Sequence, residues 1–265
     1  MFIKYIIKSL LKNKAVWFWG LTYVIIWLLM GVFLWSSTVN KEYLKEYAGI
    51  WYAIDSIFSI SFISVSLSYG MYYSSTSLAY LFKNSSLKPS KYYFNYLISV
   101  GLFFVIIGTV LEFIETILFK IKFGIIILPS NFYLSILLFF VSGIIFYSFS
   151  IVLVILINNY VGLKNISFVS FIPMILGMFF GYSALYVKIP DYLLYTNFYT
   201  PTLYLYLYSY VLKTPWIILS DPFSGNVNLD FCILSLLIWL AILIFMSIYL
   251  LTKIRASDIE EARIT

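Results

Sequence analysis

The sequence predicts an all-α membrane protein with six transmembrane helices, on three observations. Of the 265 residues, 63% are hydrophobic and only 11% are charged, whereas about a quarter of the residues in a soluble domain are charged. A chain of this length has too small a core to hide so much apolar surface from water, so we expect the bilayer to be its solvent. The apolar residues also gather in six stretches of about 20 residues or more, the length that a helix needs to cross a bilayer.

Residues 1–14, MFIKYIIKSLLKNK, have the pattern of an amphipathic helix. Lys4, Lys8 and Lys12 recur every four residues and therefore share one face. The opposite face is apolar and consists of Ile3, Ile6, Ile7, Leu10 and Leu11. Such a helix lies in the membrane interface, and we expect it to form an elbow before the first span. A simple positively charged anchor is the alternative interpretation.

The six predicted spans form one transmembrane domain over residues 1–265 and comprise residues 15–35, 51–73, 93–119, 131–157, 166–187 and 231–251. The apolar run of the first span exceeds the usual 7–15 residues of a signal-peptide core, and no A-x-A site follows it, so we expect it to be retained. The positive-inside rule sets the orientation, because with a cytoplasmic N-terminus 11 of the 17 lysines and arginines lie inside, among them Lys164, Arg255 and Arg263. Both termini of this multi-pass protein of the cell membrane are then cytoplasmic.

The cytoplasmic loop 74–92 interrupts the apolar sequence after the second span. Hydroxyl residues at 75–77 are candidate N-caps for a short apolar helix at 78–82, which Asn84 is expected to end in a left-handed conformation. Pro89 suits the first turn of the following helix. We therefore expect a separate short helix across the cytoplasmic end of the second span, with apolar residues that need a cover. An ordinary connecting loop is the alternative.

The second span is unusually rich in small polar residues. It carries Asp55 and seven hydroxyl or glycine positions, of which Ser59, Ser66 and Gly70 fall roughly on the face of Asp55. Small residues allow helices to approach closely, and their hydroxyls form hydrogen bonds across the contact. The pattern predicts either tight helix packing or the lining of a central pathway.

The fifth span carries a second pattern of small residues. Gly177 and Gly181 form a G-x-x-x-G step, and Ala184 extends the small face. This motif is a weak sign of helix dimerisation, because it also occurs by chance. Pro173 is expected to kink the same helix.

The third span contains two acidic residues on one face. Glu112 and Glu115 are three positions apart, and Lys120 and Lys122 follow close behind them. This arrangement predicts an ion-pair network at the outer membrane interface. A proton or cation relay, with Asp55 as a further member, is the alternative.

The outer segment, residues 188–230, is dominated by aromatic residues. Tyrosines alternate along 204–210, a pattern that a strand or an interfacial helix can use. Pro201 and Pro215 bracket this stretch, and we expect a short helix whose tyrosines form an aromatic belt with their hydroxyls in water. A ligand-stacking site is the alternative.

The whole arrangement resembles the membrane subunit of ABC type-2 exporters, the permease of an ATP-driven transporter. The shared features are the basic elbow helix, six spans with both ends inside, short outer helices before the last span, and the main cytoplasmic loop after the second span. In this loop, SLAYLFKNSSLKPSKYYFNYL is similar to the coupling-helix region of that family. The resemblance implies an interface with an ATPase subunit at Leu78, Tyr80, Leu81, Phe82 and Lys83. It also implies a dimer seam or pathway at Ser59, Ser66, Gly70, Gly177, Gly181 and Ala184.

The resemblance also implies the partners of the chain. The sequence has no Walker-type phosphate loop, so ATP and Mg are expected in a separate ATPase subunit, and we expect neither enzymatic activity nor a metal or cofactor in this chain. The other expected partners are a second copy of the permease or a sister permease, and the lipid bilayer, with no nucleic acid. The expected substrate is lipid-like or amphipathic and leaves the cytoplasm.

Three other functions compete with this one. A secondary transporter or channel would use Asp55, Glu112 and Glu115, although such proteins usually carry more charge in the middle of the membrane. An intramembrane enzyme is disfavoured, since the chain has no histidine and Cys232 is its single cysteine. The last alternative is a structural membrane subunit.

Overall fold

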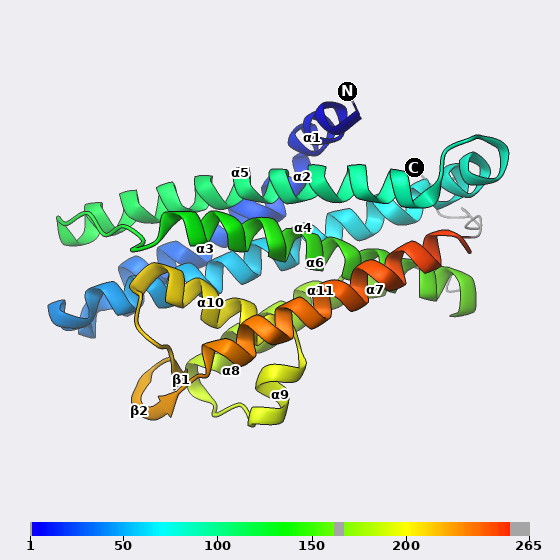
Figure 1. Cartoon of the computed structure of the whole chain (residues 1–265). Coiled ribbons are helices and arrows are strands. Elements are labelled where there is room, and N and C mark those ends of the chain that lie inside the picture. The colour runs from blue at the N-terminus through cyan, green and yellow to red at the C-terminus, as the bar shows by residue number, and fades with distance from the viewer. Residues whose placement is uncertain (1, 162–166, 255–265) are drawn as a thin grey trace.

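The computed structural model describes residues 2–161 and 167–254, which form a bundle of long helices (Figure 1). Within these residues, six helices are long and apolar enough to cross a membrane, and each overlaps one predicted span. They are Lys14–Ser37, Lys41–Asn84, Pro89–Phe123, Phe132–Tyr160, Phe168–Tyr186 and Leu229–Thr252. The chain is therefore a multi-pass membrane protein. Lys164, Arg255 and Arg263, and the predicted start of the fifth span at position 166, lie outside the described residues.

The chain begins with α1 (Phe2–Lys12), which projects from the side of the bundle and packs on α5 (Pro89–Phe123) (Figure 1). Ile6 and Leu10 are buried, whereas Lys4, Lys8 and Lys12 are exposed. The predicted amphipathic pattern is therefore confirmed, while its place at a membrane interface stays a prediction.

The first span consists of short helical segments with two π-helical turns, η1 and η2. Its segments are α2 (Lys14–Trp17), η1 (Phe18–Thr22), α3 (Tyr23–Leu29), η2 (Met30–Leu34) and η3 (Trp35–Thr38). The side chain of Asn13 caps α2 by accepting a hydrogen bond from the backbone N–H of Ala15 at 3.0 Å. The short η4 (Lys41–Tyr43) then leads into α4 (Leu44–Asn84).

The two longest helices, α4 and α5, form an antiparallel hairpin with its turn at residues 85–88. At 1.5 Å per residue, the 41 residues of α4 extend over about 60 Å, twice the thickness of the hydrocarbon core. We call residues 78–88 the α4–α5 tip. It lies at one end of the bundle, and the last turns of α4 curl out of the line of the helix there (Figure 1).

The predicted separate helix of the loop is wrong, because residues 75–82 continue α4 without a break. The Ser75 hydroxyl does not cap a new helix but donates a hydrogen bond to the carbonyl of Tyr72 at 2.6 Å, within the same helix. The helix does end at Asn84 as expected, although Ser85 is extended rather than left-handed, with φ of −129°. Pro89 lies in the first turn of α5, as predicted.

The fourth and fifth spans follow α5, and the fourth span begins at the end of the bundle opposite the tip. They consist of α6 (Phe132–Leu156), η5 (Ile157–Val161), α7 (Ser167–Ser170) and α8 (Ile172–Tyr186). The helix is interrupted at Phe171, directly before the first turn of α8, which contains Pro173. The predicted kink is therefore confirmed as a break between α7 and α8.

The outer segment folds into α9 (Asp191–Thr196), α10 (Tyr199–Val211) and a two-stranded antiparallel hairpin, β1 (Trp216–Ile218) and β2 (Asp221–Asn226), before α11 (Leu229–Leu251). The strands pair Trp216 with Asn226 and Ile218 with Asp221. We call the end of the bundle that carries these strands the hairpin end. The helical interpretation of the alternating tyrosines is confirmed.

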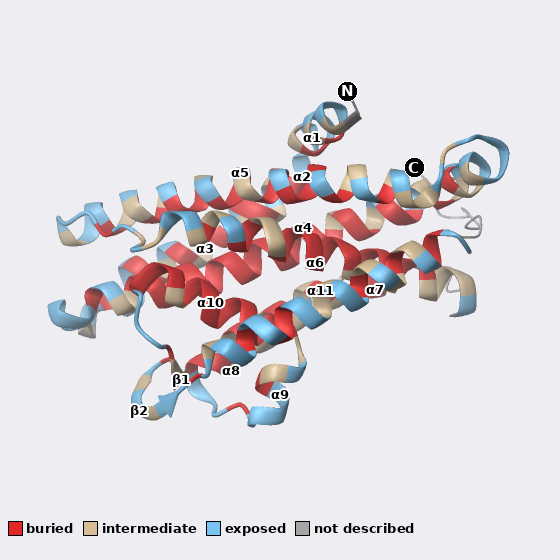
Figure 2. Cartoon of the chain, in the orientation of Figure 1, coloured by how far each residue is buried: buried red, intermediate tan, exposed pale blue. Residues whose placement is uncertain are grey.

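The position of α10 differs from the prediction. This helix inserts into the bundle and packs on α4, α6, α8 and α11, so every residue of it except Tyr208 is buried (Figure 2). The predicted aromatic belt with hydroxyls in water is therefore wrong. A helix that is apolar on all sides is stable only when other elements surround it, and α10 has no charged residue.

Candidate functional site

The α4–α5 tip presents two different faces. Leu78 is only 4% exposed, and the ring of Phe82 packs edge-on against Tyr92 of α5 at 5.6 Å between ring centroids. Tyr80 and Leu81, by contrast, are 70% and 41% exposed. The inward face therefore joins the two helices, because positions four apart lie on the same side of a helix.

The five predicted ATPase-interface residues are thus divided by the structure. Leu78 is buried and Phe82 packs on α5, so of the five only Tyr80, Leu81 and Lys83 offer exposed side chains to a partner. A tyrosine next to a leucine and a cation on one exposed helix end is suited to protein binding, since aromatic anchors dominate interface energetics. The ATPase interface itself stays a prediction, and the structure limits it to the three exposed side chains.

The glycines of the fifth span make a close contact inside the chain. A Cβ atom built on Gly177 would lie 2.2 Å from the Ser61 hydroxyl oxygen, and one on Gly181 would lie 2.7 Å from the Phe58 ring. Ala184 is fully buried on the same helix. The G-x-x-x-G step therefore allows α8 to approach α4 of the same chain, and a dimer seam through these positions stays a prediction.

The candidate positions of the second span also separate. Ser59 is buried, and its hydroxyl donates a hydrogen bond to the carbonyl of Gly20 in the first span at 2.6 Å. Ser66 is half-buried, and Gly70 is exposed with nothing within 4 Å of an added Cβ. Of these three, only the latter two lie at or near the surface of a single chain.

Several serine hydroxyls of α4 have hydrogen-bond partners, as the packing interpretation predicts, whereas Ser56 and Ser61 are buried with no partner among the described residues. Ser64 and Ser68 donate hydrogen bonds to the carbonyls one turn earlier, each at 2.8 Å. Ser150 of α6 reaches the Ser64 carbonyl at 3.3 Å, across the contact between helices. These bonds satisfy the hydroxyls inside an apolar bundle and stabilise the contacts between spans.

The acidic residues form a buried cluster of the three carboxyls that the alternative relay interpretation grouped together. Asp55, Glu112 and Glu115 are 3%, 5% and 3% exposed, and Glu115 lies within electrostatic range of both other carboxyls. The predicted ion-pair network is wrong, because the ion pair found in the described parts of the chain joins Lys213 and Glu46. Positions 112 and 115 share the inward face of α5 with the buried Phe119, whereas the two nearby lysines are exposed.

Tyrosine and serine hydroxyls surround this acidic cluster. Ser135 of α6 donates a hydrogen bond to Glu112 Oε2 at 3.3 Å and also bonds the Tyr52 hydroxyl. The Tyr206 ring of α10 packs on Tyr52 with ring centroids 5.9 Å apart, and its hydroxyl bonds the Ser142 hydroxyl at 2.7 Å. Both oxygens of Asp55 and Glu115 Oε1 have no hydrogen-bond partner among the described residues.

Burial raises the pKa of Tyr206, so its hydroxyl stays protonated and available as a hydrogen-bond donor. Within residues 2–161 and 167–254, no group of three or more His, Cys, Asp or Glu side chains is arranged to hold a metal ion.

Four helices contribute to the cluster of carboxyls and surrounding hydroxyls, and their residues are far apart in sequence. The charge-free run of α10 is compatible with burial but does not distinguish it from an interfacial belt, and no sequence feature brings Asp55 to Glu115.

Comparison with known proteins gives no further guide to function, since no family model, curated protein or solved structure matches this chain. The likeness to ABC type-2 permeases therefore depends on the arrangement of the elements and on the one sequence motif at residues 77–97.

Proposed function

We propose that the chain is the membrane permease subunit of an ATP-driven ABC exporter that uses a separate ATPase subunit. The observation that carries the proposal is the exposed apolar surface of Tyr80 and Leu81 at the α4–α5 tip. An exposed tyrosine and leucine beside Lys83, on a helix end that protrudes from the longest helix hairpin, favour a protein partner. In this proposal both termini and the tip are cytoplasmic, and ATP and Mg bind to the partner.

The continuous helical connection of the tip to the bundle supports its role in coupling. The tip is the continuous end of α4, the helix that packs against α5, α6, α8 and α10. A displacement applied to Tyr80 or Leu81 is therefore transmitted along one helix to the centre of the bundle, with no flexible loop in between. This continuity is better suited to mechanical coupling than the separate short helix that the sequence predicted.

A second permease subunit and an amphipathic substrate complete the proposal. The first, fifth and sixth spans bury less of their surface within one chain than the second span does, so they have apolar surface left for lipid or for another permease. The second subunit is a copy of this chain or a sister chain. Because the spans are strongly apolar, we propose a lipid-like or amphipathic substrate that is exported through the cell membrane.

Co-purification tests this function. The tagged chain is extracted in mild detergent from its native cells, and bound proteins and ATP turnover are measured. The proposal predicts an ATPase subunit that is retained by the wild-type chain and lost from the double variant Tyr80→Asp and Leu81→Asp. Tyr133→Asp is the matched control, because Tyr133 is 84% exposed at the opposite end of the bundle. An unchanged ATPase partner in the double variant would contradict the proposal.

The buried acidic cluster favours a second candidate function, a secondary transporter or channel using Asp55, Glu112 and Glu115. Unpaired carboxyls inside a membrane protein are costly, and they often mark ion or proton pathways. Transport by the purified chain in ATP-free proteoliposomes, driven by an ion gradient and abolished by Glu115→Gln, would establish this function instead.

A further inference from the structure

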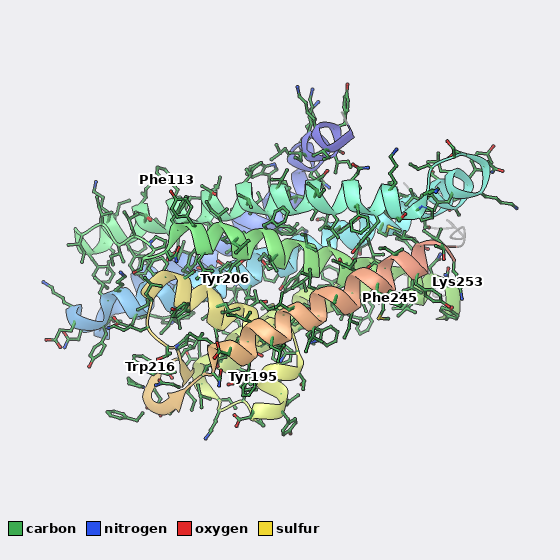
Figure 3. All side chains as sticks on the ribbon, in the orientation of Figure 1. Phe113, Tyr195, Tyr206, Trp216, Phe245 and Lys253 are labelled. Carbon is green, nitrogen blue, oxygen red and sulfur yellow. The ribbon has the colours of Figure 1, made fainter. Side chains whose placement is uncertain are left out.

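The largest cavity described lies at the hairpin end, outside every site discussed above. Its volume is about 570 Å³, within the range of small-molecule sites, and it lies between the start of α4, the end of α8 and the two strands. Six aromatic residues line it: Trp35, Tyr43, Tyr47, Trp51, Tyr186 and Trp216. Figure 3 shows Trp216 on β1 at this end of the molecule.

The aromatic walls on the α4 side are held in place. The rings of Trp35 and Trp51 are stacked with centroids 5.3 Å apart, and the Tyr47 hydroxyl donates a hydrogen bond to the Gly31 carbonyl at 2.7 Å. Trp51 lies directly on Gly31, where an added Cβ would come within 2.5 Å of its ring. These contacts fix two ring faces before any ligand binds, which reduces the entropy lost on binding.

One carboxylate lies in this aromatic lining. Glu46 is the single charged residue among the described lining residues, and its side chain is only 13% exposed. Lys213 contacts its Oε1 atom at 2.5 Å, but this lysine is 71% exposed and borders a smaller neighbouring cavity rather than the large one. No described residue forms a hydrogen bond to Glu46 Oε2. An exposed lysine contributes little to such an ion pair, so another cation can readily replace it.

We propose that this cavity binds the ammonium head of a cationic amphiphile, with its apolar part along the aromatic walls. A partly buried carboxylate attracts a cation, and aromatic faces bind alkylammonium groups through cation–π interactions. The single acidic residue in the lining excludes anionic heads. The ligand ammonium takes the place of the Lys213 ammonium at Glu46. This site is independent of the ATPase interface, so it exists whether or not the chain is an exporter subunit.

Binding of two probes of opposite charge tests the proposal. The full chain is reconstituted in nanodiscs of a neutral glycolipid, whose heads carry no ammonium group, and calorimetry measures the binding of octyltrimethylammonium and of octyl sulfate, with empty nanodiscs as the blank. We expect saturable binding of the cation only. Glu46→Gln weakens it about ten-fold or more, the loss expected when the charged partner of an ion is removed. Lys213→Met strengthens it, because the competing ammonium is gone.

If Glu46 and Lys213 form only a structural ion pair, both substitutions break this pair and change probe binding in the same direction. Opposite effects on probe affinity therefore identify a binding site. Glu42→Gln, an exposed acidic residue four positions earlier and outside the lining, is the matched control and leaves binding unchanged. Equal binding of the two probes, or an unchanged affinity in Glu46→Gln, would indicate partition into lipid and overturn the proposal. The proposal is also overturned if the wild-type chain binds no probe and forms a stable dimer in which a cysteine introduced by Trp35→Cys is protected from labelling. A second copy of the chain would then be the occupant of the cavity.

Discussion

Replacing Gly177 with valine tests whether the G-x-x-x-G step of α8 acts within one chain. In the structure, a Cβ atom at this position would lie 2.2 Å from the Ser61 hydroxyl oxygen and 2.6 Å from its Cβ. The hydroxyl can rotate away, but the Ser61 Cβ is fixed to the backbone of α4. Any side chain at Gly177 therefore forces α8 and α4 apart.

The expected cost follows from this overlap. Overpacking a close contact costs about 1–3 kcal/mol, and a branched side chain at a 2.6 Å approach belongs at the upper end of this range. The better helix propensity of valine recovers only about 0.4 kcal/mol. We therefore expect Gly177→Val to lose about 2 kcal/mol of unfolding free energy. The control is Gly70→Val, since Gly70 has open space around its Cβ position and should change stability by less than about 0.5 kcal/mol.

Thermal unfolding of the purified chain in detergent measures the difference. A loss of about 2 kcal/mol lowers the unfolding midpoint by roughly 4–8 °C in a protein of this size. The double variant Gly177→Val and Ser61→Gly should recover part of the loss, because it removes the fixed Cβ atom. Equal midpoints for Gly177→Val and Gly70→Val would refute the intramolecular contact. Loss of a dimer at unchanged monomer stability would assign the step to an interface between chains.

Three further predictions concern the cluster, α10 and the orientation. Glu112→Gln with Glu115→Gln should leave ATP-driven transport largely intact, and loss of transport by a chain that still folds, measured in proteoliposomes, would favour a relay. Tyr206→Phe should lower stability in the same unfolding assay by about 1 kcal/mol, since it removes one buried hydrogen bond, and a neutral result would contradict this role. In intact cells, a membrane-impermeant maleimide should label Lys213→Cys but not Leu81→Cys, and the reverse pattern would invert the proposed topology.

The spans could be predicted because each depends on a property of one continuous stretch. Six apolar stretches long enough for a bilayer are visible in the sequence without knowledge of their packing. The helix start at Pro89 and the break before Pro173 were predictable for the same reason, since proline acts on its own backbone. The hydrogen bond of Ser75 was not predictable, because a serine hydroxyl can either cap a new helix or bond to a carbonyl of the preceding turn, as Ser75 does.

The candidate sites depend on contacts between distant residues, and those could not be predicted. Asp55 and Glu115 are 60 positions apart, and nothing in either local sequence indicates that their carboxyls lie within electrostatic range of each other. The G-x-x-x-G step indicated a close helix contact but not its partner, which is Ser61 of the same chain. For α10, the charge-free sequence on all sides was available, but an interfacial belt and a buried helix share that composition until the surrounding helices are known.

Site-specific cross-linking tests the central claim most directly, namely that the exposed end of α4 receives an ATPase subunit. The native Cys232 is fully buried, which keeps the background low. A short thiol-reactive photo-cross-linker is attached to Leu81→Cys in native membranes, with Tyr133→Cys at the opposite end as control. The account predicts a cross-linked nucleotide-binding protein from position 81 and none from position 133. Membranes that transport normally but give no such product at position 81 would contradict it.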